Sequence, residues 1–277
     1  MATLRTVLSE GAARLAHLPT GRRDTELLLL RAVGRDRAWL LTHPDEEISQ
    51  EHIDCYQAWI RRRAAQEPVQ YILGEQEFYG LRFRVTPDVL IPRPETEHLV
   101  EALLARVSRD AALRVADVGT GSGAIAVALA HVLPRAQVTA LDISQAALAV
   151  AQGNAQAHGV EERMRFLPSD LLGAVQGERF DAVVSNPPYI ASGELLETQV
   201  RDYEPHTALF AGATGLDIYE RLIPQAREAL AAGGWLMLEM GHGQREALTG
   251  LLAGWSDVEF VDDLQGIPRV AIARRGA

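Results

Sequence analysis

The fold of this chain is decided by one stretch, Val115-Ala116-Asp117-Val118-Gly119-Thr120-Gly121-Ser122-Gly123. It reads as an apolar strand that runs into a glycine-rich turn, and the apolar segment 124–132 after it is typical of a helix. Glycines let a ligand come close to the backbone, and the first turn of a helix offers free N–H groups. The stretch therefore predicts a ligand site between a strand and a helix of an α/β domain.

An acid follows at the distance expected for a ribose contact. Asp142 ends the next predicted strand, 19 residues after Gly123, where a carboxylate takes both hydroxyls of a ribose. Strand, glycines, helix and acid together predict a nucleoside-containing ligand.

Two cofactor classes fit this loop. The segment 121–126 also matches the dinucleotide fingerprint with alanine as its last member, which keeps a dinucleotide-dependent oxidoreductase in view. Asp117, directly before the glycines, suits a cationic or amino group, and no later segment resembles a second nucleotide half. S-adenosylmethionine suits the acid better than a pyrophosphate does.

Strands and helices alternate from about residue 95 onward, which predicts a doubly wound, mostly parallel sheet with helices on both faces. The expected strands cover 114–118, 137–141, 164–168, 180–185 and 235–240, and the expected helices cover 124–132, 145–157, 218–231 and 244–252. Two final strands near 258–261 and 269–273 have too little sequence between them for a helical crossover, so they should pair antiparallel.

Apolar residues at three- and four-residue spacing predict a small helical bundle over residues 1–70. Asp24 and Ser49 are expected to start two of its helices. Arg61-Arg62-Arg63 is interpreted as a solvated helix end.

A joint separates the two domains. Aromatic and β-branched residues around Tyr79-Gly80 indicate a short hairpin, and Pro87, Pro92 and Pro94 then stiffen the chain. The predicted organisation is a helical domain at 1–70, a hairpin and joint at 71–94, and an α/β domain at 95–277.

A tetrapeptide supplies the second motif. Asn186-Pro187-Pro188-Tyr189 directly follows the predicted strand 180–185, and should open at the same carboxyl edge of the sheet as the glycine loop. The side-chain oxygen of Asn186 and the carbonyl of Pro187 can accept both hydrogens of an NH2 group, and Tyr189 can stack on its flat face. The tetrapeptide alone is equally compatible with a turn that closes a strand.

Composition excludes several functions. The chain has 277 residues and a net charge of −10, and this negative charge argues against an extensive nucleic-acid binding surface. It contains no lysine, and therefore no phosphate-loop lysine or Schiff base. Its single cysteine, Cys55, excludes a disulfide framework, and we infer no metal because no His-Glu-x-x-His occurs. Without a membrane-length apolar run or a signal-peptide core, the protein is expected in the cytoplasm.

These segments resemble the class I methyltransferases that modify planar amino groups, and the whole chain resembles the release-factor glutamine methyltransferase family. The resemblance is carried by the helical leader, by the glycine loop and the tetrapeptide, and by the segments 91–97, 203–205, 209–212, 215–216 and 263–269. It implies a seven-stranded Rossmann-like sheet, methyl transfer from S-adenosylmethionine to a glutamine side-chain amide of peptide chain release factors, and S-adenosylhomocysteine as product. We also expect a monomer without stable nucleic-acid binding or membrane attachment.

The resemblance assigns roles to residues. The loop Gly119, Thr120, Gly121, Ser122 and Gly123 would hold the methionine part of the cofactor, Asp142 the ribose, and Asp117, Asp170, Leu171 and Asn186 would complete the cofactor site. Asn186, Pro187, Pro188 and Tyr189 would bind the glutamine amide, with Asn186, Pro187 and Tyr189 catalytic. Leu171 stands where some relatives carry an aromatic residue against adenine. An adenine methyltransferase acting on DNA or RNA, with the same tetrapeptide on a flipped base, is the alternative.

Two further features are predicted near the ligand. Glu239 lies at the ligand-side end of the predicted strand 235–240, where it either faces the cleft or is a plain strand-end acid. The segment 203–206 is expected to form part of a lid or substrate wall.

Overall fold

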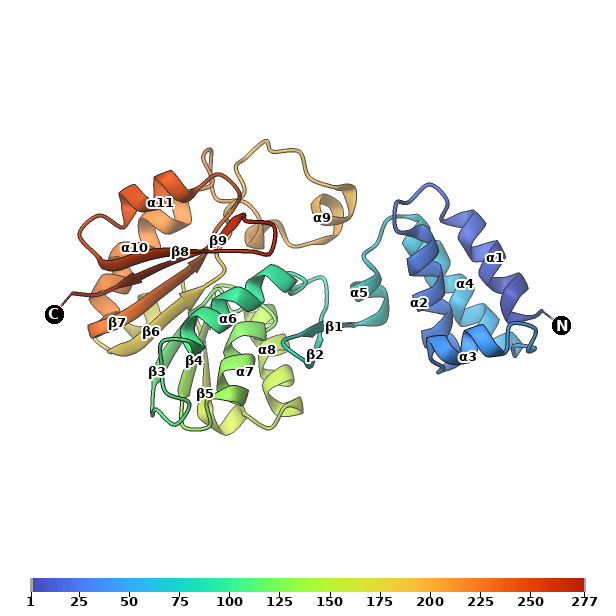
Figure 1. Cartoon of the computed structure of the whole chain (residues 1–277), viewed down its shortest axis with the longest axis horizontal. Helices are drawn as coiled ribbons and strands as arrows, with labels where there is room; N and C mark the ends of the chain where they lie inside the picture. The colour runs from blue at the N-terminus through green and yellow to red at the C-terminus, as the bar shows by residue number, and fades with distance from the viewer. Residues whose placement is uncertain (1, 277) are drawn as a thin grey trace. The chain divides into compact units, whose positions relative to one another are not determined.

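The computed structural model describes residues 2–276 and divides into two compact units, which are treated separately below (Figure 1). One unit comprises the chain up to Gly74 together with Glu197–Tyr203, and the other comprises Glu75–Leu196 and the chain from Glu204 onward. The described residues contain no helix long and apolar enough to cross a membrane.

The first unit is a helical bundle. Its helices are α1 (Leu4–Arg14), α2 (Gly21–Val33), α3 (Arg37–Thr42), α4 (Gln50–Ala64), α5 (Val69–Leu73) and α9 (Thr198–Tyr203). Their apolar faces enclose one core that includes Leu4, Leu28, Leu29 and Ile60. Ser49 caps α4 as predicted, because its side chain accepts a hydrogen bond from the His52 amide.

The prediction that Asp24 starts a helix is wrong. Helix α2 begins at Gly21, and Asp24 lies within its first turn, where it is buried. The interpretation of the arginine triplet as a solvated helix end is also wrong for its last member. Arg61 and Arg62 are exposed, whereas Arg63 is buried and pairs with Asp24 at 2.7 Å. Sequence spacing did not reveal this pair because its members lie 39 residues apart.

Helix α9 belongs to the helical unit although its sequence lies far along the chain. The Tyr203 hydroxyl donates a hydrogen bond to the carbonyl of Ala65, with 2.6 Å between the oxygens. The chain therefore leaves the second unit after Leu196 and re-enters it at Glu204.

The second unit contains a seven-stranded sheet. Its strands are β3 (Arg114–Val118), β4 (Gln137–Asp142), β5 (Met164–Pro168), β6 (Phe180–Ser185), β7 (Leu230–Glu239), β8 (Ser256–Asp262) and β9 (Pro268–Arg274), in the order β5-β4-β3-β6-β7-β9-β8. Strands β5, β4, β3, β6 and β7 run parallel, and β9 pairs antiparallel with β7 and with β8. The predicted mostly parallel sheet and its antiparallel final pair are confirmed.

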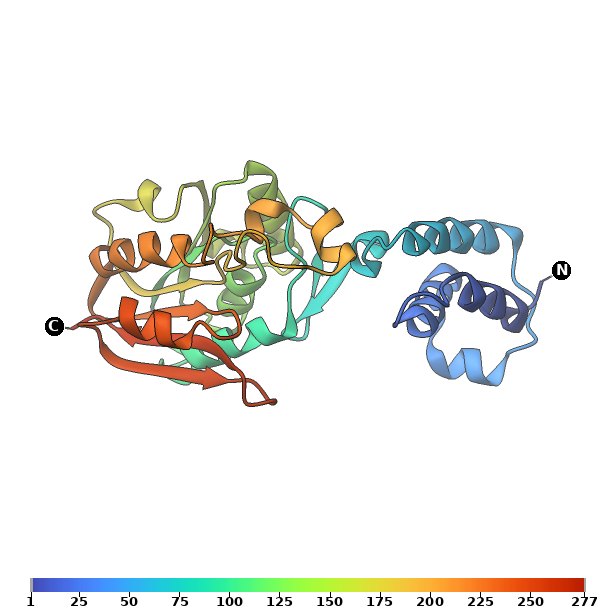
Figure 2. The same cartoon turned by 90° about the horizontal axis from the view of Figure 1, so that it is seen from above.

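Helices cover both faces of this sheet (Figure 2). Helices α6 (Glu97–Leu104), α7 (Ala124–Val132) and α8 (Gln145–Ala157) lie on one face, and α10 (Asp217–Ala229) and α11 (Arg245–Leu251) lie on the other. Alternate residues of a strand pack on opposite faces of the sheet. Val115 and Val184 belong to the core on one face, whereas Ala116 and Val183 belong to the core on the other. This two-sided burial explains why the parallel strands are rich in apolar residues.

The largest change in a predicted boundary lies between α10 and β7. Helix α10 ends at Ala229, before residue 231, because Leu230 already pairs with Phe180 of β6. Strand β7 is therefore longer than predicted, and its register against β6 shifts between Phe180 and Ala182.

A hairpin precedes the sheet in sequence. Strands β1 (Glu75–Phe78) and β2 (Leu81–Arg84) pair antiparallel. Tyr79 and Gly80 connect them with φ angles of 53° and 71°. A two-residue type I′ turn requires positive φ at both positions, which explains why glycine follows the tyrosine.

Candidate active site

A cavity of about 380 Å³ opens at the carboxyl ends of the parallel strands. Its walls come from the segments that follow β3, β4, β5 and β6, and from the joint before α6. The predicted residues among those that line it are Gly119, Thr120, Gly121, Ser122, Asp142, Asp170, Leu171, Asn186, Pro187 and Pro188. Its volume lies within the range of about 300–1,000 Å³ that is usual for small-molecule sites.

The glycine loop is fixed by the neighbouring strand. The amides of Gly119 and Thr120 both donate to the carbonyl of Leu141, at 2.8 and 2.9 Å. Gly119 and Gly121 have φ angles of 71° and 55°, and a Cβ added at either would meet no protein atom within 4 Å. Both positions therefore present bare backbone to open space, as a ligand cradle requires.

Gly123 plays a different part and does not line the cavity. It precedes α7, and a Cβ built on it would lie 3.0 Å from the Cβ of Ala151 in α8. Glycine at this position lets the loop pack against α8.

Asp142 is oriented by backbone amides. Its Oδ2 accepts from the amide of Gly121 and its Oδ1 from the amide of Ser144, both at 2.9 Å. Burial raises the pKa of this carboxyl, and the two amides partly oppose that rise. Each carboxylate oxygen has a further lone pair, so the group can still accept hydrogen bonds from ribose hydroxyls.

Asp117 lies beneath the loop, fully buried, and does not line the cavity. Its Oδ2 accepts a hydrogen bond of 2.6 Å from the Thr120 hydroxyl, whereas its Oδ1 is buried without a partner. Burial raises the pKa of Asp117 to about 7. A buried carboxylate with an unpaired oxygen is stabilised by positive charge nearby, which fits a ligand that carries an ammonium or sulfonium group.

The segment after β5 forms another wall. Leu171 lines the cavity with a positive φ of 52°, a region that branched side chains rarely occupy. The Ser169 hydroxyl holds this bend, since it donates to the carbonyl of Leu171 at 2.8 Å and accepts from the amide of Ala174 at 3.0 Å. Asp170 forms an ion pair with Arg221 at 2.5 Å. This wall is aliphatic and carries no aromatic residue against the cavity at position 171.

The tetrapeptide meets the cavity at the end of β6. Ser185 anchors it, because its hydroxyl donates to the carbonyl of Val118 at 2.6 Å. Asn186 donates through Nδ2 to the Thr96 hydroxyl at 3.0 Å, and no described residue donates to its Oδ1. Pro187 and Pro188 line the cavity beside it. The turn thus presents an amide oxygen that is available to a donor.

Tyr189 does not line the cavity. Its ring packs against the core on the α10 and α11 side, and its hydroxyl lies 3.5 Å from Oε1 of Glu239. Its carbonyl accepts from Nε2 of Gln244 at 3.0 Å. A Cβ added to Gly215 would lie 2.3 Å from that carbonyl, so the segment before α10 approaches the turn as closely as glycine permits.

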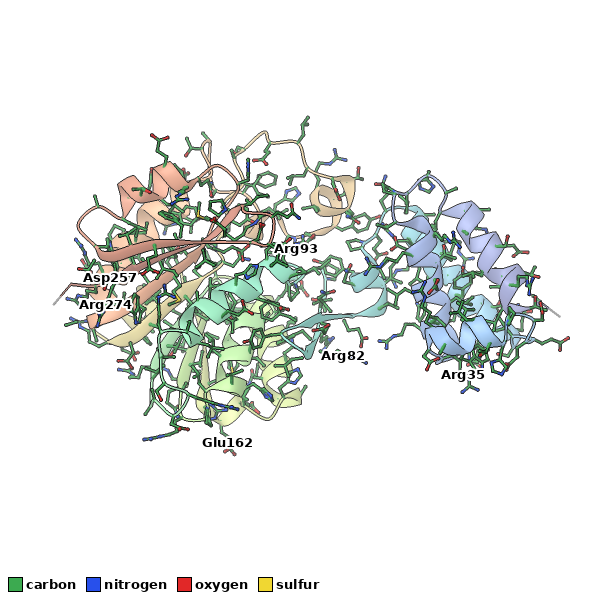
Figure 3. The ribbon with its side chains drawn as sticks, viewed as in Figure 1. Arg35, Arg82, Arg93, Glu162, Asp257 and Arg274 are labelled. Carbon is green, nitrogen blue, oxygen red and sulfur yellow. The ribbon has the colours of Figure 1, made fainter. Side chains whose placement is uncertain are left out.

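An ion pair ties the joint to the segment after α9. Glu204 is buried and binds Arg93, and its Oε2 also accepts from the amide of Ile91 at 3.2 Å. Arg93 lies in the joint just before Pro94, and lines the cavity (Figure 3). Pro205 and Phe210 line the cavity as well, whereas Tyr203, Glu204 and His206 of the predicted segment do not.

The comparisons with known proteins agree along the chain. Residues 6–74 match the family described as PrmC N-terminal domain, and residues 95–202 match the methyltransferase small domain. A release factor glutamine methyltransferase of Koribacter versatilis is 47% identical over 263 residues, which cover 94% of this chain and 93% of that protein. The chain belongs to the release factor glutamine methyltransferase family. A relative of the same name from Geobacter sulfurreducens is 45% identical and covers 99% of this chain and 97% of its own length.

A solved structure supports the fold of this family member. The 16S rRNA N2 G1207 methyltransferase of T. thermophilus, in complex with AdoMet and guanosine, superposes with a TM-score of 0.56 at 22% identity. The match covers 73% of this chain and 49% of that one. The second unit therefore has the fold of a methyltransferase.

Several residues that line the cavity of this methyltransferase were not predicted from the sequence, among them Ile143 and Thr96. Ile143 lines the cavity although 68% of it is exposed, and its signal was an apolar residue directly after the strand-end acid. Thr96 lines the cavity from the joint and holds Asn186 across 90 positions of sequence. Its only signal was its place inside the segment 91–97. No cluster of three or more potential metal ligands occurs within residues 2–276.

Proposed function

We propose that this protein transfers a methyl group from S-adenosylmethionine to the side-chain amide nitrogen of a glutamine in peptide chain release factors. One observation carries the proposal: the turn with the free Asn186 oxygen opens into the same cavity as the glycine loop and Asp142. Family membership supports the choice of a glutamine amide over an adenine amino group. The net charge of −10 is also unfavourable for a nucleic-acid substrate.

The cavity suits the cofactor. The bare backbone of Gly119 and Gly121 would face its methionine part, the free lone pairs of Asp142 its ribose, and Leu171 with Ile143 its adenine. The unpaired oxygen of Asp117 adds negative charge behind the loop. When bound, S-adenosylmethionine supplies a methyl group on a sulfonium and leaves as S-adenosylhomocysteine.

The tetrapeptide can compensate for the low nucleophilicity of the substrate's amide nitrogen. An amide nitrogen is a poor nucleophile because its lone pair is delocalised into the carbonyl. Asn186 Oδ1 and the Pro187 carbonyl would accept its two hydrogens, stabilise the positive charge that develops on nitrogen, and hold the nitrogen in one orientation. The proton leaves to water after nitrogen has gained its fourth bond, so no side chain has to act as a base beforehand. Tyr189 does not line the cavity, so its part is to support the turn from behind.

The remaining assignments follow from this activity. Residues 1–70 would dock the folded protein substrate, residues 71–94 would connect them to the catalytic domain at 95–277, and the protein would work as a cytoplasmic monomer. A stable complex with nucleic acid is not expected at a net charge of −10.

The decisive experiment offers labelled S-adenosylmethionine with purified release factor, duplex DNA and ribosomal RNA, and maps the modified atom. We expect label on a glutamine side-chain nitrogen of the release factor alone. Asn186→Ala should abolish transfer while cofactor affinity, measured by calorimetry, persists. Label found only in nucleic acid would refute the substrate, and near-normal turnover of Asn186→Ala would refute the mechanism.

A further inference from the structure

A buried acid stands behind the tetrapeptide and has no part in the reaction described so far. Glu239 is the last residue of β7 and is 2% exposed. Ser185 of β6 pairs with Leu238 of β7, so the next residues, Asn186 and Glu239, leave adjacent strands side by side. The carboxyl group therefore lies next to the acceptor turn without reaching the cavity, which it does not line.

Few hydrogen-bond donors contact the Glu239 carboxyl group. The Tyr189 hydroxyl is 3.5 Å from Oε1, and Oε2 is buried without a hydrogen-bond partner. The Thr96 hydroxyl lies close enough to lower the pKa of Glu239, although burial, the larger effect, raises that pKa to about 7. An acid this poorly satisfied is costly, and such groups are retained more often at functional sites than elsewhere.

Thr96 contacts the turn through its side chain. It occupies the position before α6, where threonine commonly caps a helix, yet its side chain makes no capping hydrogen bond. Its hydroxyl instead accepts from Nδ2 of Asn186 at 3.0 Å, and is 4% exposed. A hydroxyl has one hydrogen to donate, so the partner that takes this hydrogen determines what the hydroxyl can offer to Asn186.

We propose that ionised Glu239 accepts the hydrogen of Thr96 and thereby fixes the Asn186 carboxamide with its oxygen toward the methyl-acceptor nitrogen. If the carboxyl is protonated or replaced by an amide, it can donate to Thr96 itself. The hydroxyl is then free to donate to Asn186, which favours the flipped carboxamide with Oδ1 turned away. Glu239 and Thr96 are thus positioning residues that act through Asn186, which touches the substrate.

The same carboxylate supports the other end of the turn. As an acceptor for the Tyr189 hydroxyl it holds that ring, whose pKa is raised mainly by burial and next by Glu239. Around Glu239 the charged neighbours are Glu95 from the joint, which raises its pKa, and Arg269 from β9, which lowers it. Loss of the Glu239 charge therefore disturbs both Asn186 and Tyr189.

This inference rests on the proposed function for its kinetic test. We expect Glu239→Gln and Thr96→Val each to lower kcat by about 100-fold, the scale on which a misplaced reacting group costs rate. The KM for release factor and the cofactor affinity should stay near wild type. Thr96→Ser should retain activity, and the double variant Thr96→Val with Glu239→Gln should lose no more than either single variant, because the two act through one contact.

A second readout needs no methyl acceptor. In ¹⁵N-labelled protein, the Asn186 side-chain NH2 resonance, assigned by its absence from Asn186→Asp, should titrate between pH 6 and pH 8. It should not titrate in Glu239→Gln. Asp117 also titrates near pH 7, so its influence is removed by repeating the titration in Asp117→Asn.

The two readouts separate the possible failures. If no glutamine substrate is methylated but the Asn186 resonance titrates as expected, the proposed function fails and the positioning contact stands. The positioning role is overturned if the Asn186 resonance does not shift with pH, or if Thr96→Val has the kcat of wild type. Either result counts even where release factor is methylated.

Discussion

Arg63 of α4 and Asp24 of α2 form an ion pair of 2.7 Å, and their side chains are only 6% and 10% exposed. Arg63 also donates to the carbonyl of Glu67 at 3.1 Å, and Asp24 accepts from the Thr20 hydroxyl at 2.7 Å. The pair therefore joins three segments of the helical unit in its interior.

Removing one partner of this pair should destabilise the helical unit. Arg63→Met leaves Asp24 buried without its counter-charge, a change that costs about 3–5 kcal/mol of unfolding free energy. Hydrogen exchange followed by mass spectrometry should show faster exchange in α2 and α4, with the sheet of the second unit unaffected. Arg61→Met, in the exposed neighbour, is the control. Equal exchange in the two variants would contradict the structural role.

A methyl group at Gly121 should block the cofactor. Gly121→Ala places a Cβ in the open space of the cavity, at a φ of 55°. Gly177→Ala is a matched control, since Gly177 has a φ of 83° and open space but lies outside that cavity. Both variants incur the backbone penalty of about 1–2 kcal/mol. Calorimetry with S-adenosylmethionine should show weakened binding for Gly121→Ala only, and equal losses would argue against the cradle.

The stability of the unliganded protein should depend on pH through Asp117. Burial raises its pKa from 3.8 to about 7, so the folded state binds more protons than the unfolded state between these values. The contribution of Asp117 is therefore present below pH 4 and is lost as pH rises to 7, at up to about 1.4 kcal/mol per pH unit.

Asp117→Asn isolates this effect from that of other acids. Urea titrations at several pH values give the unfolding free energy of each protein. The unfolding free energy of wild type should fall relative to that of the variant as pH rises. Thr120→Val removes the hydrogen bond that favours the charged form, so it should raise the pKa of Asp117 further and extend the wild-type trend to higher pH. Parallel curves for wild type and Asp117→Asn would disprove the pKa shift.

Glu204 should hold the cavity wall. Glu204→Gln removes the ion pair with Arg93 and weakens the bond from the Ile91 amide, and bonds to charged groups contribute about 1.5–3 kcal/mol each. We expect a lower thermal midpoint together with weaker cofactor binding, because the joint and the segment at 205–210 both line the cavity. The exposed Glu246→Gln serves as control. Cofactor affinity equal to wild type would separate this pair from the site.

Much of the sheet could be predicted from local patterns. Strands such as Arg114–Val118 and Phe180–Ser185 have the predicted bounds because both of their faces are buried and most of their residues are apolar. The end of α10 could not be predicted, since the pairing of Leu230 with Phe180 stops it rather than any local signal.

In the site, too, local sequence patterns could be predicted, whereas contacts between distant segments could not. Glycines and a strand-end acid are local signals, and Gly121 and Asp142 do lie against one cavity. The contact of Thr96 with Asn186 and the pairing of Arg93 with Glu204 join residues 90 and 111 positions apart, so only the folded chain reveals them. Sequence order likewise gave no sign that Tyr189 would turn its hydroxyl to Glu239 and its ring to the core.

Because the chain returns to the helical unit at α9, the two units cannot be separated by one cut in the sequence. The chain passes from one unit to the other at three places, after Gly74, after Leu196 and after Tyr203. A protease that cuts once near Gly74 would leave α9, which belongs to the helical unit, on the fragment that carries the sheet. A gene fragment that starts at residue 75 would carry α9 without the bundle it packs with. Separate expression of the catalytic unit therefore calls for a short linker in place of residues 197–203.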